Sequence, residues 1–378
     1  MNIGLIDVDG HNFPNLALMK LSSYHKAKGD RVSWCTNGLD PYDRVYMSKV
    51  FSYSDEPEFL PNAKEVIKGG TGYQIHLNGN CEVYDKVTDK VLPYEVEHAY
   101  PDYDLYGITD TAYGFMSRGC PKGMIHKYCH VAAKEGLCSV KVADLSEFWD
   151  GQKYIELMDP NTMACKDWED ILGQLADSKA WVNFNQGVDI QLLTKEKALA
   201  LRKVKVKHVH FAWDNYGDKE IVVPAFETLK RETNWGRSKV SAYVLVNFDT
   251  TIEQDLERIY FLRSLDIQPY PMIYNKGEFF HKNGRLKSTE ELKAKFSQEQ
   301  IEHAKLCQKI QRWCSPFVFW SCPKFEITTQ ARKETKMFKP IYTEDGTLYL
   351  ETQAEFRAII RDGEYIGWYD PRLAVVLD

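Results

Sequence analysis

The residues best suited to chemistry lie in one short segment, SRGCPKGMIHKYCHVAAKEG, at positions 117–136. Two cysteines, Cys120 and Cys129, bracket a short loop in this segment, and His126 stands between them in the spacing C-x5-H-x2-C. An apolar stretch, 113–116, runs into the loop like a strand. Thiolate and imidazole groups at the end of a strand are ligands for an iron–sulfur cluster or a zinc ion. The sequence therefore predicts a metal centre here.

The segment resembles the cluster loop of the radical S-adenosylmethionine (radical SAM) superfamily. In that family three cysteines spaced C-x3-C-x2-C hold a [4Fe-4S] cluster, and SAM binds the open iron and is cleaved to a radical that abstracts hydrogen from the substrate. The resemblance is closest to members whose loop reads TRGCP…C-x-aromatic-C…KEG. The matching residues are Arg118-Gly119-Cys120-Pro121, Tyr128-Cys129 and Lys134-Glu135-Gly136. Lys134 and Glu135 are expected to fix the loop by an ion pair.

The middle of the loop departs from the family pattern, because His126 stands where the second cysteine belongs, three residues before Cys129. Imidazole can ligate iron, as it does in Rieske-type centres. We therefore expect Cys120, His126 and Cys129 to hold the cluster. His130 and Cys138 are further candidates for the third ligand.

The resemblance also implies where SAM would bind. Functional groups of parallel α/β barrels gather at the carboxyl ends of the strands, and several predicted strands end in polar residues. Asp159 stands where the family has a group for the SAM ammonium, Gln186 and Asp189 are candidates for the ribose hydroxyls, and Asn247 for the carboxylate or the adenine. The backbone at Tyr128 corresponds to the part of the loop that holds adenine. The alternative for each Asp and Asn is a helix cap.

Two further functions remain open at this stage. A degenerate radical SAM fold that binds no iron would act as a non-catalytic binding or scaffold protein. A zinc site would use Cys120, His126, Cys129 and one of His130 or Cys138. The sequence indicates neither the substrate nor a residue that acts on it.

The composition sets limits on the cellular setting. The chain has 378 residues, 44% hydrophobic and 27% charged, which is ordinary for a globular protein. It has no apolar run long enough to predict a transmembrane helix, and its first residues do not resemble a signal peptide. Nine cysteines without a disulfide-like pattern favour a reducing, cytoplasmic setting. The family implies an electron donor such as flavodoxin or ferredoxin.

The net charge of −6 argues against a surface that coats nucleic acid. One segment, KEKALALRKVKVK at 195–207, is nevertheless basic. We interpret it as a solvated helix face that leads into a strand, and a phosphate-binding patch is the alternative. A nucleic-acid partner is therefore possible in principle but unsupported.

The elements that position these residues begin with a small Rossmann-like α/β unit in 1–110. Its predicted strands are 3–8, 32–35 and 45–51, its helix is 15–28, and an irregular acidic linker follows at 71–110. This unit resembles a shortened cobalamin-binding domain. Cobalamin is not expected, because the D-x-H-x-x-G turn of that family is matched by Asp9 and His11 but has Pro14 in the place of glycine.

Strands and helices alternate in the second predicted domain, 111–325. The expected strands are 112–118, 154–158, 181–185, 207–212, 241–247 and 269–274, and the expected helices are 144–150, 168–178, 194–203, 220–232 and 251–264. This order predicts a parallel sheet with right-handed crossovers, and the resemblance implies the partial (βα)6 barrel of radical SAM enzymes. Thr194 and the run Thr250–Glu253 predict helix N-termini. The run 317–322 is strand-like, and 326–378 is expected to form a small appended unit, with two or three strands and a helix in 340–378.

Overall fold

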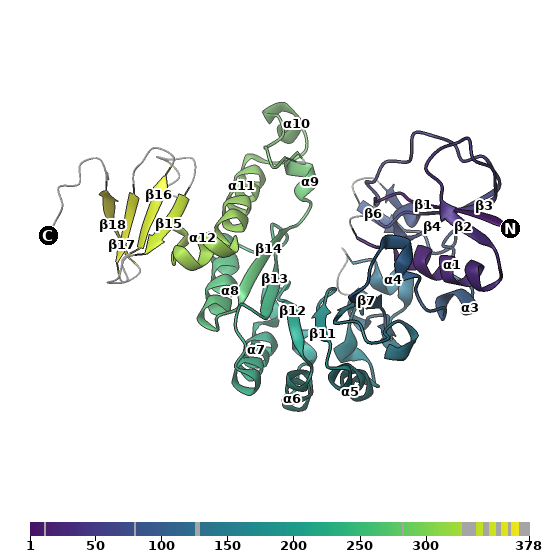
Figure 1. Ribbon diagram of the computed structural model, residues 1–378. Coiled ribbons are helices and arrows are strands. Elements are labelled where there is room, and N and C mark those ends of the chain that lie inside the picture. The colour runs from purple at the N-terminus through teal and green to yellow at the C-terminus, as the bar shows by residue number, and fades with distance from the viewer. Residues whose placement is uncertain are drawn as a thin grey trace. The chain divides into compact units, whose positions relative to one another are not determined.

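The structure is a computed structural model of the whole chain. It describes residues 1–10, 13–78, 81–124, 129–281, 283–326, 338–342, 348–352, 357–361 and 364–369. The fold is mixed α/β (Figure 1), as predicted. The chain divides into two compact units, of which the first comprises Met1–His210 with Thr228–Asn234 and the second comprises Phe211–Glu227 with Trp235–Asp378. The domain boundaries expected near residues 110 and 325 remain predictions.

The first unit begins with a parallel four-stranded sheet in the order β2-β1-β3-β4. Its strands are β1 (Asn2–Asp7), β2 (Arg31–Trp34), β3 (Tyr42–Ser48) and β4 (Ala63–Gly69). Helix α1 (Leu16–Ala27) connects β1 to β2, and its Leu18 and Leu21 share a core cluster with Ile3 and Leu5 of β1. The expected linker at 71–110 contains short elements, namely α2 (Thr71–Gln74), β5 (Ile75–Asn78), β6 (Cys81–Tyr84) and α3 (Tyr94–Glu97).

A parallel six-stranded sheet follows, and its strand order is β14-β13-β12-β11-β10-β7. The strands are β7 (Thr111–Gly114), β10 (Tyr154–Leu157), β11 (Trp181–Phe184), β12 (Val206–Ala212), β13 (Val240–Val246) and β14 (Gln268–Ile273). The connecting helices are α5 (Trp168–Ser178), α6 (Lys195–Lys203), α7 (Lys219–Thr233) and α8 (Ile252–Ser264). All six predicted strands are therefore present. The helix expected at 144–150 is only a short 3-10 turn, Leu145–Glu147.

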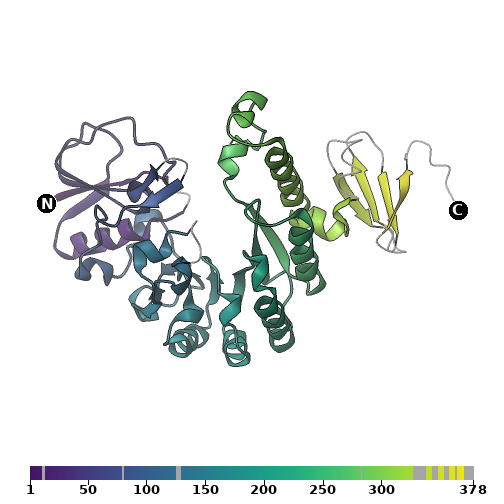
Figure 2. The same ribbon diagram turned by 180° about the vertical axis from the view of Figure 1, so that it is seen from behind.

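The strands of this sheet in the first unit have one apolar and one polar face. Ile155 and Leu157 of β10 are buried, whereas Glu156 between them is only partly buried, because successive side chains of a strand point to opposite faces. The same alternation holds in β11. Figures 1 and 2 show α5 and α6 along one side of these strands. The buried residues of α5 and α6 are Ile171, Leu172, Leu175, Ala198 and Leu201.

One predicted helix cap is confirmed, and the predicted capping box occurs one residue later than expected. The Thr194 side chain accepts a hydrogen bond from the amide of Lys197 at the start of α6. Thr251 and Gln254 form a capping box at the start of α8. Thr251 lies within the predicted run Thr250–Glu253, and Gln254 is the residue after this run. Each cap satisfies amide groups that the first turn of a helix leaves unpaired.

The second unit contains α11 (Gln298–Trp313) and α12 (Pro316–Ser321) besides α8. A core cluster joins Ile259, Ile310, Trp313, Phe319 and Cys322. The prediction of a strand-like run at 317–322 was wrong, because this run lies mostly in α12. Pro316 at the first helical position favours helix initiation there.

An antiparallel four-stranded sheet ends the described chain. Its strands are β15 (Phe338–Tyr342), β16 (Leu348–Thr352), β17 (Arg357–Arg361) and β18 (Glu364–Tyr369), in sequential order. The expectation of two or three strands and a helix was therefore incomplete, and the described residues after 337 contain no helix. In no part of the chain that could be searched does a helix have the length and apolar character needed to cross a membrane.

Candidate functional site

The segment that carries the two cysteines forms a loop whose ends are tied together. Strand β8 (Ser117–Arg118) pairs antiparallel with β9 (Val140–Lys141). The amide of Cys120 donates to the carbonyl of Gly136 at 3.1 Å. A 3-10 turn, Pro121–Met124, and helix α4 (Val131–Glu135) lie between these ends. The backbone position of Cys120 is therefore set by contacts on both sides of the loop.

Asp159 follows β10 and anchors the start of this loop. Its side chain is buried, and Oδ1 accepts the amide of Met116 at 2.7 Å. Oδ2 accepts the amide and the hydroxyl of Ser117, at 2.8 and 2.6 Å, and the hydroxyl of Thr162 at 3.3 Å. Burial raises the pKa of Asp159 to about 6, although these donors favour the ionised form. Both oxygens thus bind the chain itself, and a contact with the SAM ammonium stays a prediction.

Ion pairs hold the loop from the other side. Arg118 Nη1 lies 3.2 Å from Glu135 Oε1, and Arg118 Nη2 lies 2.9 Å from Glu97 Oε1. Glu135 Oε2 also accepts the amide of Gly119 at 3.2 Å. Lys134 Nζ lies 3.9 Å from Glu135 and donates to the hydroxyl of Thr71 at 2.8 Å. The expectation that Lys134 and Glu135 fix the loop is confirmed, with Arg118 as the main partner of Glu135.

Two residues predicted for the site, Cys120 and Asp189, are brought together by Asn161. The Asn161 amide nitrogen lies 3.4 Å from Cys120 Sγ and 3.4 Å from Asp189 Oδ2. Asn161 is 2% exposed, and its buried Oδ1 has no hydrogen-bond partner among the described atoms. Lys122 Nζ lies 2.6 Å from Asp189 Oδ1. Sequence reasoning did not select Asn161 or Lys122, although Asn161 belongs to the polar end of β10 that marked Asp159.

The other predicted site residues are less closely grouped. His126 and Tyr128 lie outside the described residues. Cys129 is partly buried, whereas Gln186 is exposed after β11. Asn247 belongs to the second unit, where it follows β13 and donates to the carbonyl of Tyr274 at 3.1 Å. The described geometry therefore unites Cys120, Asn161, Asp189 and Lys122.

A row of polar side chains crosses the polar face of the sheet. Tyr113, Glu156, Asn183 and His208 are neighbours in register across β7, β10, β11 and β12. The amide of Asn183 donates to Glu156 at 2.8 Å. The ring of His210, two residues further along β12, lies 4.6 Å from that of His208. The signal available in the sequence was the period-two alternation of polar and apolar residues in these strands.

We expect His210 to contribute less stability as the pH falls. Desolvation, with help from His208, lowers the pKa of His210 to about 4 from an ordinary value of 6.5. The unfolded chain therefore binds a proton first, and the contribution is present above pH 6.5 and lost as the pH falls toward 4. The free energy of unfolding of wild type, minus that of His210→Gln, should decrease between pH 7 and pH 5 in urea titrations. A difference that is constant over this range would contradict the expectation.

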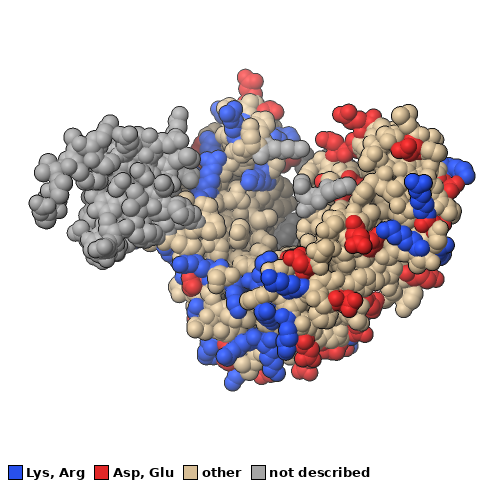
Figure 3. All heavy atoms as spheres, in the orientation of Figure 1, with Lys and Arg blue, Asp and Glu red and all other residues tan. Residues whose placement is uncertain are grey.

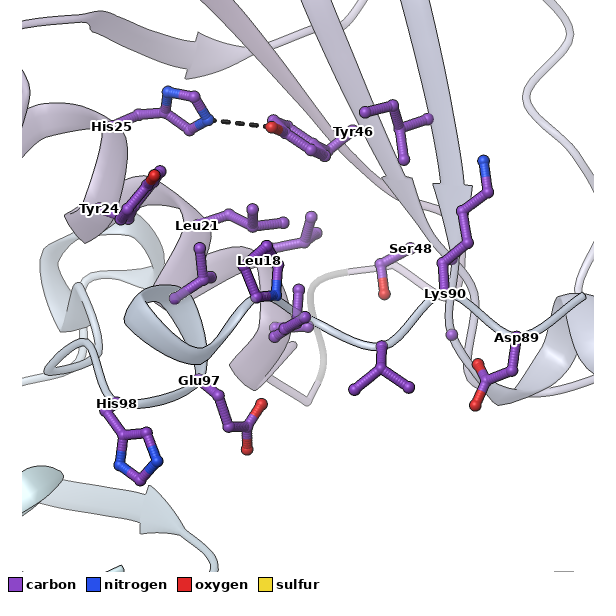
Figure 4. A pocket seen from close by; sticks show the side chains of 18 of the residues that line it. Leu18, Leu21, Tyr24, His25, Tyr46, Ser48, Asp89, Lys90, Glu97 and His98 are labelled. Atoms are coloured by element: carbon purple, nitrogen blue, oxygen red, sulfur yellow. Dashed lines mark hydrogen bonds between the residues drawn. The ribbon is translucent and has the colours of Figure 1, made fainter. Parts of the chain in front are cut away.

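A hollow of about 1150 Å³ lies beside the four-stranded sheet in the first unit (Figure 4). It is lined by α1, β3, β4 and the segment 89–98. His25 Nε2 lies 3.0 Å from the hydroxyl of Tyr46 on its wall. Arg118 and Glu135 also line it, so the ion pair that holds the candidate loop forms part of the wall. None of the described residues predicted for the site lines this hollow.

Lysine and arginine side chains gather around α6 at the lower edge of the view in Figure 3. Several side chains of the basic segment 195–207 contact the protein itself. Lys197 donates to the carbonyl of Met163 at 2.8 Å, and the ammonium of Lys205 lies 4.5 Å from the ring centre of Trp181. Lys207 lies similarly over Tyr154 at 4.7 Å. These contacts favour a structural interpretation of the segment over a phosphate site.

Comparison with known proteins adds no assignment. No protein-family model matches this chain, and no curated protein matches it in sequence. The residues and their geometry are therefore the basis for the function proposed next.

Proposed function

We propose that this protein is a radical SAM enzyme that holds a [4Fe-4S] cluster in the loop 117–136 and cleaves SAM reductively to start radical chemistry. The observation that carries the proposal is the position of Cys120. Cys120 follows β7, Asn161 follows β10 and Asp189 follows β11. The sulfur of Cys120 lies next to the side-chain amide of Asn161. Ligand sites of parallel α/β proteins lie at this edge of the sheet. The resemblance of the loop supports iron as the occupant.

The order of the six strands supports the finer architecture that we propose, a partial (βα)6 barrel. From β7 to β14 each strand neighbours the next one along the chain, apart from the short β8–β9 hairpin. In a barrel, neighbouring strands follow one another along the chain and helices connect them. In a doubly wound sheet, the strand order changes direction in the middle of the sheet. For the N-terminal four-stranded unit we propose a shortened Rossmann-like fold.

Cobalamin is not part of the proposal. Asp9, the first residue of the turn that would bind it, accepts the amide of Val50 at 2.5 Å and the hydroxyl of Ser54 at 2.6 Å. Its carboxylate therefore closes a loop of the protein itself. His11 of the same turn lies outside the described residues, and Pro14 replaces the glycine of the pattern.

The donor groups near Cys120 fit a cluster and SAM. Cys120, His126 and Cys129 are the proposed ligands, and the cluster supplies the electron that cleaves SAM. The amide nitrogen of Asn161 lies 3.4 Å from the sulfur of Cys120 and donates to it. The unpartnered Oδ1 of Asn161 is an acceptor that the SAM ammonium would satisfy.

Two of the remaining predicted groups keep the roles that the resemblance implies. Asp189 and Gln186 bind the ribose hydroxyls, and the ion pair of Asp189 with Lys122 must open for this contact. The SAM contacts expected of Asn247 and of the backbone at Tyr128 stay predictions that the resemblance implies. Asp159 positions the start of the loop through its four hydrogen bonds. The row from Tyr113 to His208 offers groups that can orient a substrate of unknown class.

The proposal includes a partner and a compartment. Reductive cleavage of SAM needs one electron from outside, so we propose an electron donor such as flavodoxin or ferredoxin. An oxygen-sensitive cluster and nine cysteines without a disulfide-like spacing fit a reducing cytoplasm. No nucleic-acid partner is proposed, because the basic side chains around α6 contact the protein itself.

The proposal is tested by the iron and sulfide content of protein purified and reconstituted without oxygen. We expect about four irons per chain and the broad visible absorbance of a [4Fe-4S] cluster. Variants Cys120→Ala, Cys129→Ala and His126→Ala should each lose most of the iron. Cys138→Ala tests the further candidate, an exposed cysteine two residues after the loop, and this variant should keep its iron if Cys120, His126 and Cys129 are the ligands.

Other outcomes select the alternatives. Wild type that is iron-free after reconstitution would refute the proposal, and metal analysis would then separate a zinc site from a non-catalytic scaffold. If iron is bound, dithionite and SAM should yield 5'-deoxyadenosine. Asn161→Ala should weaken SAM binding by about tenfold, roughly the value of one hydrogen bond to a charged group.

A further inference from the structure

Three potential metal ligands meet in the second unit of the protein. Asp255 lies in the first turn of α8, and His303 and Cys307 lie on α11. Residues four positions apart lie on one face of a helix, so His303 and Cys307 face the same way. One ligand atom from each of the three residues lies within 4.8 Å of the other two. No other such trio exists among the residues that the structure describes.

The two oxygens of Asp255 have different partners. Oδ1 accepts the hydroxyl of Thr250 at 2.6 Å and the guanidinium of Arg258 at 2.5 Å. The other oxygen, Oδ2, lies on the side of Cys307, at 3.9 Å from its Sγ. Metal-binding carboxylates are oriented in this way, since a hydrogen-bonded outer oxygen fixes the inner one.

The sulfur of Cys307 has an outer contact of the same kind. The backbone amide of Asn247 donates to this sulfur. Asn247 follows β13 with a positive φ of 64°, so the loop turns sharply at the residue whose amide points to α11. The loop after β13 and the two helices α8 and α11 therefore converge on one point.

The negative charge of Asp255 is compensated by a neighbouring side chain when no ion is bound. Asp255 and Arg258 are fully buried and neutralise each other. Arg258 also donates to the carbonyls of Trp213 and Leu245, both at 2.7 Å, which holds its charge near Oδ1. Burial, together with the Asp255 carboxylate, raises the pKa of the Cys307 thiol.

We propose that Asp255, His303 and Cys307 form a tetrahedral site for a zinc-class divalent ion, with water as the fourth ligand. One oxygen, one nitrogen and one sulfur are the donors that Zn²⁺ takes. Bond lengths of about 2.0–2.3 Å place tetrahedral ligand atoms roughly 3–4 Å apart, so small side-chain rotations would close the site. The ion would join α8 to α11. This inference uses none of the cluster ligands, and it shares with the proposed function only Asn247, whose backbone amide contacts Cys307.

Cobalt(II) is the probe for this site, because it takes the geometry of zinc and is coloured. The titration uses the full-length chain with the loop cysteines removed, Cys120→Ser with Cys129→Ser. We expect one cobalt ion per chain and a thiolate-to-cobalt charge-transfer band that zinc abolishes. Adding Cys307→Ala should abolish the band, and adding His303→Ala should weaken binding at least tenfold.

The matched control is Cys314→Ala, which removes a buried cysteine at the end of the same helix but outside the trio. This variant should keep the band, and circular dichroism checks that every variant is folded. If the folded protein with Cys120→Ser and Cys129→Ser shows no charge-transfer band, the inference is overturned, even if wild type binds cobalt. A band that survives Cys307→Ala would also overturn it. Failure of iron reconstitution leaves this test unaffected, so the two proposals fail separately.

Discussion

Replacement of Gly119 by alanine is expected to abolish cluster binding while the sheets remain folded. Gly119 has a φ of +89°, which costs an L-residue roughly 1–2 kcal/mol. A Cβ there would lie 2.1 Å from the carbonyl oxygen of Cys138, which is a backbone atom and cannot rotate away. The chain must therefore shift at the residue that precedes Cys120. This shift would break the hydrogen bond from Cys120 to Gly136 and displace the first proposed ligand.

The measurement is iron per chain after reconstitution, compared with the control Gly136→Ala. Gly136 has a similar φ of +101°, but a Cβ there meets no atom within 4 Å. The control thus carries the backbone strain without the collision, and it should keep most of its iron. Equal iron in both variants would show that the approach of Cys138 to Gly119 does not position Cys120.

Replacement of Asp159 by alanine is expected to destabilise the first unit by roughly 2–4 kcal/mol. The amides of Met116 and Ser117 and two hydroxyl groups would lose their acceptor in a buried environment. Each unsatisfied buried group costs about 1–3 kcal/mol, and a water molecule that enters the space recovers part of this. Urea unfolding at pH 7 measures the effect. Asp104→Asn, an exposed carboxyl of the same unit, should change the free energy of unfolding little.

The pH dependence gives this prediction a second signature. The pKa of Asp159 is about 6 in the folded protein and 3.8 as its ordinary value. Between these values the folded protein holds a proton that the unfolded chain has lost. The stability of wild type should therefore fall by about 2 kcal/mol as the pH rises from 4 to 6. The difference between wild type and Asp159→Ala should be largest near pH 4. A difference that grows with pH would count against the buried, raised carboxyl.

Much of the fold was predictable because it depends on local patterns. The six strands of the parallel sheet are short apolar or alternating runs separated by amphipathic helices, and each was found within a few residues of its predicted position. Thr194 and Thr251 marked helix starts, because a side-chain cap is made within three residues of the chain. The run 317–322 was misread, because a short apolar run has no periodicity that separates helix from strand.

The candidate site was predictable only in part. Residue type selected Cys120 and Asp189, and the structure brings them together through Asn161. Residue type also selected Asp159, but an aspartate at the end of a strand can bind a ligand or the backbone. In the structure the chain at Met116 lies close to Asp159, and the carboxylate of Asp159 therefore binds the backbone there. The glutamate of the KEG tail was predicted to form an ion pair, while Arg118 as its partner followed only from the closed loop.

By itself the sequence determined the alternation of strands and helices and the loop that carries Cys120, His126 and Cys129. Both are properties of neighbouring residues, since periodicity and spacing act over a few positions. Only the tertiary structure decided that Asn161 lies between Cys120 and Asp189, and that Asp255 meets His303 and Cys307. These contacts join residues far apart in the chain, and they depend on how strands and helices pack rather than on any local pattern.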